Sequence, residues 1–215
     1  MLERTAPAVA VVLSLLAGCK REAPAPSPTT TPSSSAPVAA NPTQPARANE
    51  AVAPAAAAGL RVDSPSRESL VAQGQDAPRF RATAHDGRVI ESAGPRARPL
   101  VVYFYPRDET PGCTVEAEGF RDASREFEAA GVDVVGVSTD SNDAHRGFAT
   151  NHQLGFALVS DPEAKLAGAF GVGVRMGYAS RVTIVIDRSG RVSRVFESVT
   201  PAGHATEVLA AARAS

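Results

Sequence analysis

The sequence predicts an α/β fold in which a central mixed sheet is flanked by helices, with a disordered tether at the N-terminus. From about residue 80 onward, apolar runs of strand length alternate with segments of helical periodicity. Two pairs of short apolar runs are joined by turn sequences, as in hairpins. Residues 23–59, by contrast, are almost all Ala, Pro, Ser and Thr, and such a stretch buries too little apolar surface to fold.

The first half of the folded part is expected to contain a hairpin, a buried strand and a helix. Residues 80–84 and 88–91 form the hairpin around His85-Asp-Gly. Residues 100–105 are a continuous apolar run, which is typical of a strand covered on both faces. The helix that follows has one apolar stripe and ends at Gly131; the stripe consists of Phe120, Ala123, Phe127 and Ala130.

The second half continues the alternation and closes the domain. Asp161 is expected to lead into one of its helices, and Ser189-Gly190 to form the turn of a second hairpin. The expected elements are a strand at 132–138, a helix at 143–152, a strand at 156–159, a helix at 162–170, hairpin strands at 181–187 and 191–196, and a helix at 206–212. We therefore place one folded domain at residues 64–215.

Composition excludes several classes of function. A chain of 215 residues with 43% hydrophobic content has room for one domain with a real core. Its formal net charge of −1 supplies no basic surface for nucleic acid. His145 and His152 lie seven residues apart without a third ligand, so we expect no metal, and we expect no cofactor.

The N-terminus has the features of an export signal. Arg4 is followed by an apolar run at residues 6–17 that is too short to span a bilayer. Leu16-Ala-Gly-Cys19 resembles the lipobox of bacterial lipoproteins, which implies cleavage after residue 18 and a diacylated Cys19. An uncleaved anchor helix and an ordinary signal peptide are the alternatives. With residues 19–63 as a linker, the domain would be held at a membrane of the bacterial cell envelope, facing the periplasm or the exterior.

Cys113 is the candidate nucleophile. If Cys19 is a thioether, Cys113 has no partner in its own chain, and a lone thiol in an exported protein usually performs chemistry. Pro106, Thr110 and Cys113 follow the pattern P-x-x-x-T-x-x-C between a strand and a helix. A thiol in the first helical turn faces unpaired N–H groups and the positive end of the helix dipole, which favours the thiolate. The alternative is a buried cysteine that acts only as a small hydrophobe.

This stretch resembles the active-site motif of peroxiredoxins, most closely of the PrxQ (bacterioferritin comigratory protein) type, and the similarity runs from Leu70 to the C-terminus. Four further segments occur in the expected order: residues 74–80, G-x-x-A-P-x-F; residues 136–141 with His145 and Phe148; Ser160-Asp-Pro followed by Phe170-Gly-Val; and residues 181–187. The resemblance implies a thioredoxin-like fold with the peroxiredoxin N-terminal addition. It also implies that a peroxide is the substrate and that a thiol is the reductant.

Each site residue receives an expected role. Thr110 and the Cys113 N–H position the peroxide, while Pro106 closes the pocket above the sulfur. Arg181 begins a strand beside this loop; its fixed positive charge can stabilise the thiolate and the peroxide oxygens, and by resemblance it is the family's catalytic arginine. By resemblance, Glu116 orients that arginine. Arg107 and Arg175 are weaker candidates, and Asp108 and Glu109 are expected to be exposed loop charges.

The chain departs from the PrxQ pattern at one position. Many PrxQ proteins carry a second, resolving cysteine five residues after the first, and Glu118 occupies that position here. A sulfenic acid on Cys113 would then be reduced by an external thiol, thioredoxin-like or glutathione-like. Two other functions stay open: a thioredoxin-like thiol–disulfide oxidoreductase, although Glu116 stands where the second cysteine of C-x-x-C would be, and a binding lipoprotein without enzymatic activity.

Overall fold

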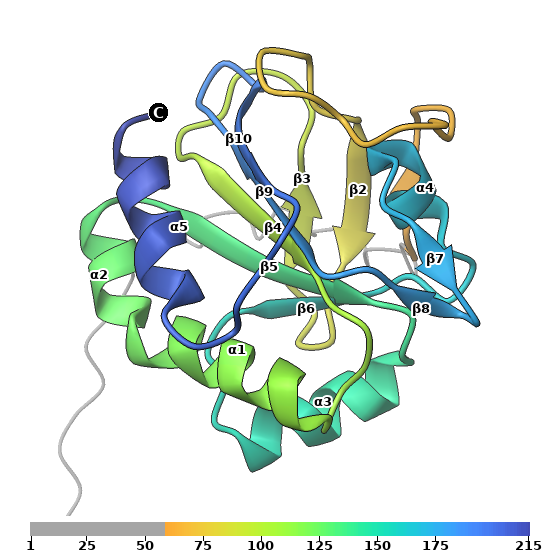
Figure 1. Ribbon diagram of the computed structural model, residues 1–215, viewed down its shortest axis with the longest axis vertical. Helices are drawn as coiled ribbons and strands as arrows, with labels where there is room; N and C mark the ends of the chain where they lie inside the picture. The colour runs from red at the N-terminus through yellow and green to blue at the C-terminus, as the bar shows by residue number, and fades with distance from the viewer. Residues whose placement is uncertain (1–58) are drawn as a thin grey trace, which may run out of the picture. The chain divides into compact units, whose positions relative to one another are not determined.

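A five-stranded mixed sheet forms the centre of the fold in the computed structural model, which describes residues 59–215 (Figure 1). The strand order is β10-β9-β4-β5-β6. β4 pairs with β5 in parallel and with β9 in antiparallel orientation, so the sheet is mixed as predicted. The strand bounds are β4 Leu100–Phe104, β5 Asp133–Ser138, β6 Ala157–Ser160, β9 Val182–Ile186 and β10 Val192–Phe196.

Two smaller antiparallel sheets accompany the central one. The first has the order β1-β2-β3 and contains the predicted N-terminal hairpin; its strands are Arg61–Val62, Phe80–Thr83 and Val89–Glu91. The second, which sequence patterns did not reveal, pairs β7 (Val174–Arg175) with β8 (Tyr178–Ala179). Strands of two residues are too short to show an alternating pattern.

Alternating side chains of β4 divide the core into two layers. Leu100, Val102 and Phe104 pack with α4 (Lys165–Phe170) and the β1-β2-β3 sheet. Val101 and Tyr103 pack on the opposite face with the other helices. Those helices are α1 Pro111–Asp122, α2 Ser124–Ala129, α3 Asn142–Asn151 and α5 His204–Arg213. Both faces of β4 are therefore buried, which is why its sequence is apolar throughout.

The predicted elements are confirmed with two corrections. The helix expected to run to Gly131 is divided into α1 and α2 at Ala123, although Phe120 and Phe127 of the stripe are both buried. α4 begins at Lys165 and not at residue 162, because Ala164 adopts a left-handed conformation with φ of 53°. Asp161 nevertheless leads into this helix, since its carboxylate accepts the backbone N–H groups of the helix's second and third residues.

The structure adds a strand just before the predicted domain boundary at residue 64. β1 pairs Arg61 with Arg81 and Val62 with Phe80, so the ordered structure already includes residues assigned to the linker. The two-residue strand lacked an apolar pattern that could have indicated it. The predicted signal segment, Cys19 and the linker up to residue 58 lie outside the described residues. Within residues 59–215, no helix combines the length and apolarity needed to cross a membrane.

Candidate active site

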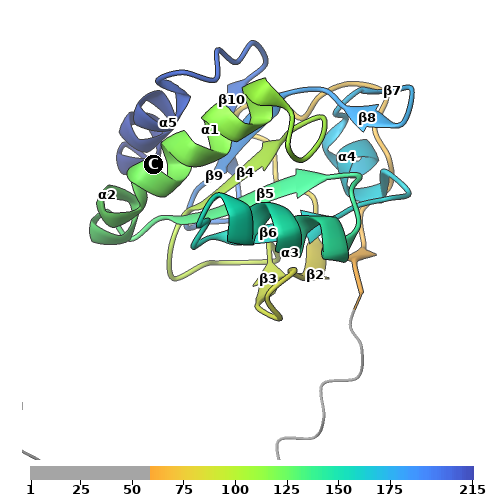
Figure 2. The ribbon, with the colours of Figure 1, turned by 90° about the horizontal axis from the view of Figure 1, so that it is seen from below.

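The loop that leaves β4 leads into α1 (Figure 2). Cys113 lies in the first turn of this helix. Thr110 is the N-cap residue and Pro111 occupies the first helical position, where the missing N–H of proline costs nothing. The cysteine is only 1% exposed, and it packs against the central sheet with Ala117 and Phe120. Its sulfur is thus held at the helix N-terminus, as the sequence predicted.

Arg181 is the charged partner of this sulfur. Its Nη2 donates a hydrogen bond to Cys113 Sγ over 3.2 Å, from a position one residue before β9. Gly112 permits this approach, because a Cβ atom there would lie 3.3 Å from Nη2. The guanidinium stays charged at every physiological pH, so it places a fixed positive charge beside the sulfur.

Glu116 holds the other side of the guanidinium. Its Oε2 accepts a hydrogen bond from Arg181 Nη1, and the residue is 1% exposed, not a solvated helix residue. Burial raises the pKa of Glu116 to about 7, although the charge of Arg181 opposes that rise. The structure therefore brings Cys113, Arg181 and Glu116 together as a contiguous cluster.

Thr110 and Pro106 precede Cys113 along the chain. Both are partly buried in the loop between β4 and α1. The Thr110 hydroxyl donates a hydrogen bond to the backbone carbonyl of Arg107 over 3.0 Å, and it does not cap the helix. Because its proton is used there, the hydroxyl oxygen is left as an acceptor for a substrate O–H.

A match to a protein-family model shows which family the chain belongs to. The AhpC/TSA family model matches residues 73–195, which is more than half of the chain. The chain belongs to the AhpC/TSA family. Within it, the relatives are peroxiredoxins of the Q type: a chloroplastic peroxiredoxin Q of Sedum lineare is 39% identical over 142 residues, spanning 65% of this chain and 76% of the relative. A putative peroxiredoxin bcp of Coxiella burnetii is 37% identical over 143 residues, spanning 63% and 95%.

Solved structures agree with this assignment. The peroxidoxin BcpB of Mycobacterium tuberculosis superposes with a TM-score of 0.60 at 33% identity, covering 66% of this chain and 96% of that one. A peroxiredoxin Q structure of Xanthomonas campestris gives 0.56 at 34% identity, covering 62% and 89%. The fold is therefore the thioredoxin-like fold of peroxiredoxins, and this peroxiredoxin is a thiol-dependent peroxidase.

Sequence reasoning missed a buried polar group in the active-site loop of this peroxiredoxin. Asp108, expected to be exposed, is 7% exposed, and its carboxylate accepts hydrogen bonds from Tyr105 and His145. His145 is fully buried in α3. The only signal available was His145 in the second signature segment, and nothing in the sequence placed it beside Asp108.

The weaker candidates of the sequence analysis lie on the surface. Arg107 is exposed, donates to the Tyr178 hydroxyl over 3.3 Å and lies over its ring, whereas Arg175 is exposed in β7. Glu109 is exposed as predicted and contacts His152. The guanidinium that contacts Cys113 belongs to Arg181.

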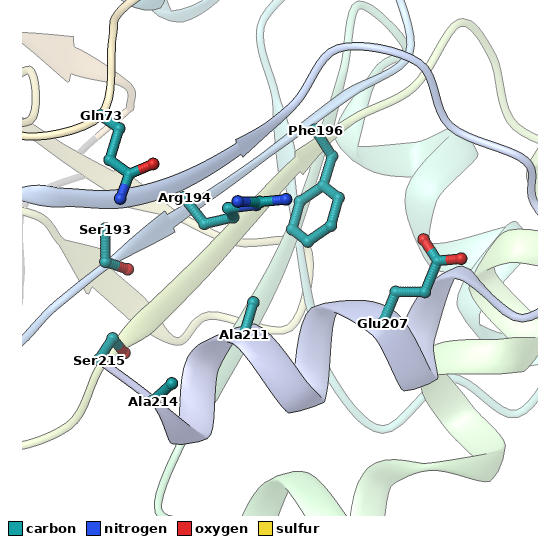
Figure 3. Close-up of a pocket in the computed structure, with 8 residues that line it drawn as sticks. All are labelled: Gln73, Ser193, Arg194, Phe196, Glu207, Ala211, Ala214 and Ser215. Carbon is teal, nitrogen blue, oxygen red and sulfur yellow. The ribbon is translucent and has the colours of Figure 1, made fainter.

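A cavity of about 510 Å³ lies between β10 and α5, away from this cluster (Figure 3). Arg194, Phe196 and Glu207 line it, and none of the predicted site residues does. A peroxide group has only two oxygen atoms to accommodate, so a reaction at Cys113 would not need a large cavity. In the part of the chain that the structure describes, no cluster of three His, Cys, Asp or Glu side chains is arranged to bind a metal.

Proposed function

We propose that this peroxiredoxin reduces hydrogen peroxide and organic hydroperoxides by a one-cysteine mechanism at Cys113. The observation that carries the proposal is the hydrogen bond from Arg181 Nη2 to a buried Sγ at the start of α1. The thiolate attacks one peroxide oxygen, the O–O bond breaks, and the leaving oxygen departs with the electron pair and takes up a proton. The products are a sulfenic acid on Cys113 and water or an alcohol.

The side chains around Cys113 suit the movement of negative charge from the sulfur to the leaving oxygen. Arg181 faces the sulfur, so its positive charge can stabilise the negative charge that moves from sulfur to the leaving oxygen. Glu116 fixes the guanidinium in this orientation. The Thr110 oxygen, free to accept a proton donor, can orient the peroxide O–H. Organic substrates are supported by the related bacterioferritin comigratory protein of Xanthomonas campestris, whose structure was determined to explain its alkyl peroxide reduction activity.

The one-cysteine assignment rests on position 118. Glu118 contacts Arg121 at 3.4 Å and His152 at 3.3 Å on the surface of α1, in the place where many Q-type relatives would carry a second thiol. Cys113 is the one cysteine within residues 59–215, and it is free. The sulfenic acid must then form a mixed disulfide with an external thiol, releasing water, and a second thiol regenerates Cys113.

Peroxide consumption with and without an added thiol tests this function. The wild-type chain should consume peroxide through many turnovers only when a thiol is present, and Cys113→Ser should consume none. Peroxide consumption by Cys113→Ser at the wild-type rate would reject the proposed chemistry. An internal disulfide in the oxidised wild type would reject the one-cysteine mechanism alone.

We also propose, from the sequence alone, that Cys19 is lipidated and anchors the domain to a membrane of the cell envelope. The Leu16-Ala-Gly-Cys19 boundary supports this location, and two acyl chains suffice for stable anchoring. Mass spectrometry of the mature N-terminus tests it. A mature protein that begins at another residue and is recovered in aqueous extract would contradict the anchor.

A further inference from the structure

The loop that carries Pro106 and Thr110 is hydrogen-bonded to the protein interior through the carboxylate of Asp108. Asp108 Oδ1 accepts a hydrogen bond from the Tyr105 hydroxyl over 2.7 Å, and Asp108 Oδ2 lies 2.8 Å from His145 Nδ1. All three side chains are buried. Since a buried carboxylate is costly unless it is hydrogen-bonded, both contacts stabilise Asp108 in this position, and the contact with His145 joins the loop to α3.

The same fastening reaches Thr110 through a single peptide unit. The Asp108 N–H donates to Asp140 Oδ2 over 2.9 Å, and the carbonyl on the other side of that peptide bond, Arg107 O, accepts the Thr110 hydroxyl. The orientation of this peptide therefore sets the direction in which the Thr110 oxygen presents its lone pairs. Displacing Asp108 would turn the peptide and misdirect the hydroxyl.

We propose that Asp108 and His145 are positioning residues for peroxide reduction, acting through the Arg107–Asp108 peptide on Thr110. The inference rests on the proposed function, because Thr110 matters here only if a peroxide binds beside Cys113. The hydrogen bond to the sulfur comes from Arg181, and Asp108 and His145 act at one remove from it. Their task is to keep the loop and the Thr110 hydroxyl in the geometry that the reaction needs.

The two nitrogens of His145 have different surroundings, so substitutions can separate a positioning role from a role in core packing. Nδ1 faces Asp108, whereas Nε2 is buried without a hydrogen-bond partner. An asparagine can place an amide N–H near the position of Nδ1, and a glutamine places one nearer that of Nε2. If the Nδ1 contact is what matters, asparagine should preserve function better than glutamine or leucine.

The test compares His145→Asn, His145→Gln and His145→Leu in the full chain. The rate constant for reaction of the reduced protein with hydrogen peroxide should fall about 10- to 100-fold in the leucine and glutamine variants, because small misplacements of reacting groups are this costly. The asparagine variant should stay within a few-fold of wild type. Alkylation of Cys113 by iodoacetamide should accelerate in the leucine variant, since a loosened loop at the start of α1 would expose the buried sulfur.

His152→Leu is the matched control. His152 contacts Glu109 of the same loop at 2.9 Å, but this ion pair is at the surface and contributes little in water. Its peroxide and alkylation rates should remain within about twofold of wild type. Should His145→Leu fail to fold, Asp108→Asn replaces it, because asparagine keeps the size of the side chain but offers one acceptor oxygen to two donors.

Unchanged peroxide and alkylation rates in His145→Leu would overturn the inference. It would also be overturned if the asparagine and leucine variants, at equal stability, reacted with peroxide equally slowly. Neither result would touch the proposed function, which wild-type activity tests separately. If the wild type consumes no peroxide, the function fails, while the alkylation rates still report whether His145 fastens the loop.

Discussion

At the scale of single residues, the site depends on a charge placed against a buried sulfur. Arg181 donates hydrogen bonds to Cys113 Sγ and to Glu116 Oε2, so one guanidinium links the sulfur to a carboxylate. The electrostatic effect of this cation is large because little water screens it: the Arg181 side chain is 18% exposed and Glu116 is fully buried. Two predictions concern this pair.

Replacing Arg181 by methionine should slow the reaction with peroxide about 100-fold, which corresponds to the loss of roughly 3 kcal/mol of transition-state stabilisation. Stopped-flow measurement of the second-order rate constant checks this value. Arg175→Met is the control, because that arginine is exposed in β7 and should be replaceable without effect. A normal rate in Arg181→Met would mean that the arginine is only structural.

Replacing Glu116 by glutamine should remove a pH effect near neutrality. With a pKa of about 7, the Glu116 carboxyl loses its proton as pH rises through 7, and the carboxylate then holds Arg181 more firmly. The rate constant of the wild type for peroxide should therefore rise through pH 7 in a step that Glu116→Gln lacks. At high pH the variant should be about tenfold slower. Rate constants between about pH 5 and 9 measure it. Parallel pH profiles in the two proteins would refute the role of this carboxyl.

At the scale of secondary-structure elements, sequence patterns predicted what is periodic and missed what is short or assembled from distant parts. The apolar run of β4 and the stripe of Phe120 and Phe127 were sufficient to predict a strand and a helix, because the side chains that form these patterns are buried in the core. β1 and the β7–β8 hairpin have too few residues for a period to appear. The Asp108 contact was missed because an aspartate in a polar loop looks the same whether or not a histidine of α3 reaches it.

The packing of α5 on β9 should make stability depend on pH. His204, the first residue of α5, lies 2.8 Å from the Thr183 hydroxyl, and burial together with the nearby charge of Arg181 lowers the pKa of His204 to about 4. The unfolded chain, whose His204 has its ordinary pKa of 6.5, binds more protons between pH 6.5 and 4, so this group destabilises the fold as pH falls through that window.

His204→Gln should reduce that loss, because a glutamine can keep the bond to Thr183 without gaining a proton. The difference in free energy of unfolding between variant and wild type should be at most about 3 kcal/mol near pH 4, because each unit of pKa shift corresponds to about 1.4 kcal/mol. Glu116, with its raised pKa, acts in the opposite direction, so the comparison must be variant against wild type. Urea unfolding at two pH values measures it. An equal loss of stability on acidification in both proteins would contradict the assignment.

At the scale of the whole molecule, the catalytic domain begins earlier than its composition suggested. β1 extends the small sheet through its pairing with β2, and Val62 packs against the core from this strand. The site itself lies on the opposite face of the central sheet, where α1 begins. Truncation should therefore affect stability and activity differently.

A chain that begins at Ser64 should lose about 1 kcal/mol of stability relative to one that begins at Gly59, because the partial burial of Val62 is lost. Both chains should react with peroxide at the rate of the full chain, since β1 does not contact Cys113 or Arg181. Urea unfolding and single-turnover kinetics on the same samples separate the two effects. A large loss of activity in the longer of these two chains would show that the preceding residues contribute to the site.

Intact-mass spectrometry of the reduced full chain, before and after one equivalent of hydrogen peroxide, tests the central claim most directly. Cys113 should gain one oxygen atom within a single turnover, no internal disulfide should form, and an added thiol should reverse the change. Excess peroxide should then add a second oxygen, because no other thiol is present within residues 59–215 to trap the sulfenic acid. An unchanged mass, or the same gain of oxygen in Cys113→Ser, would contradict it.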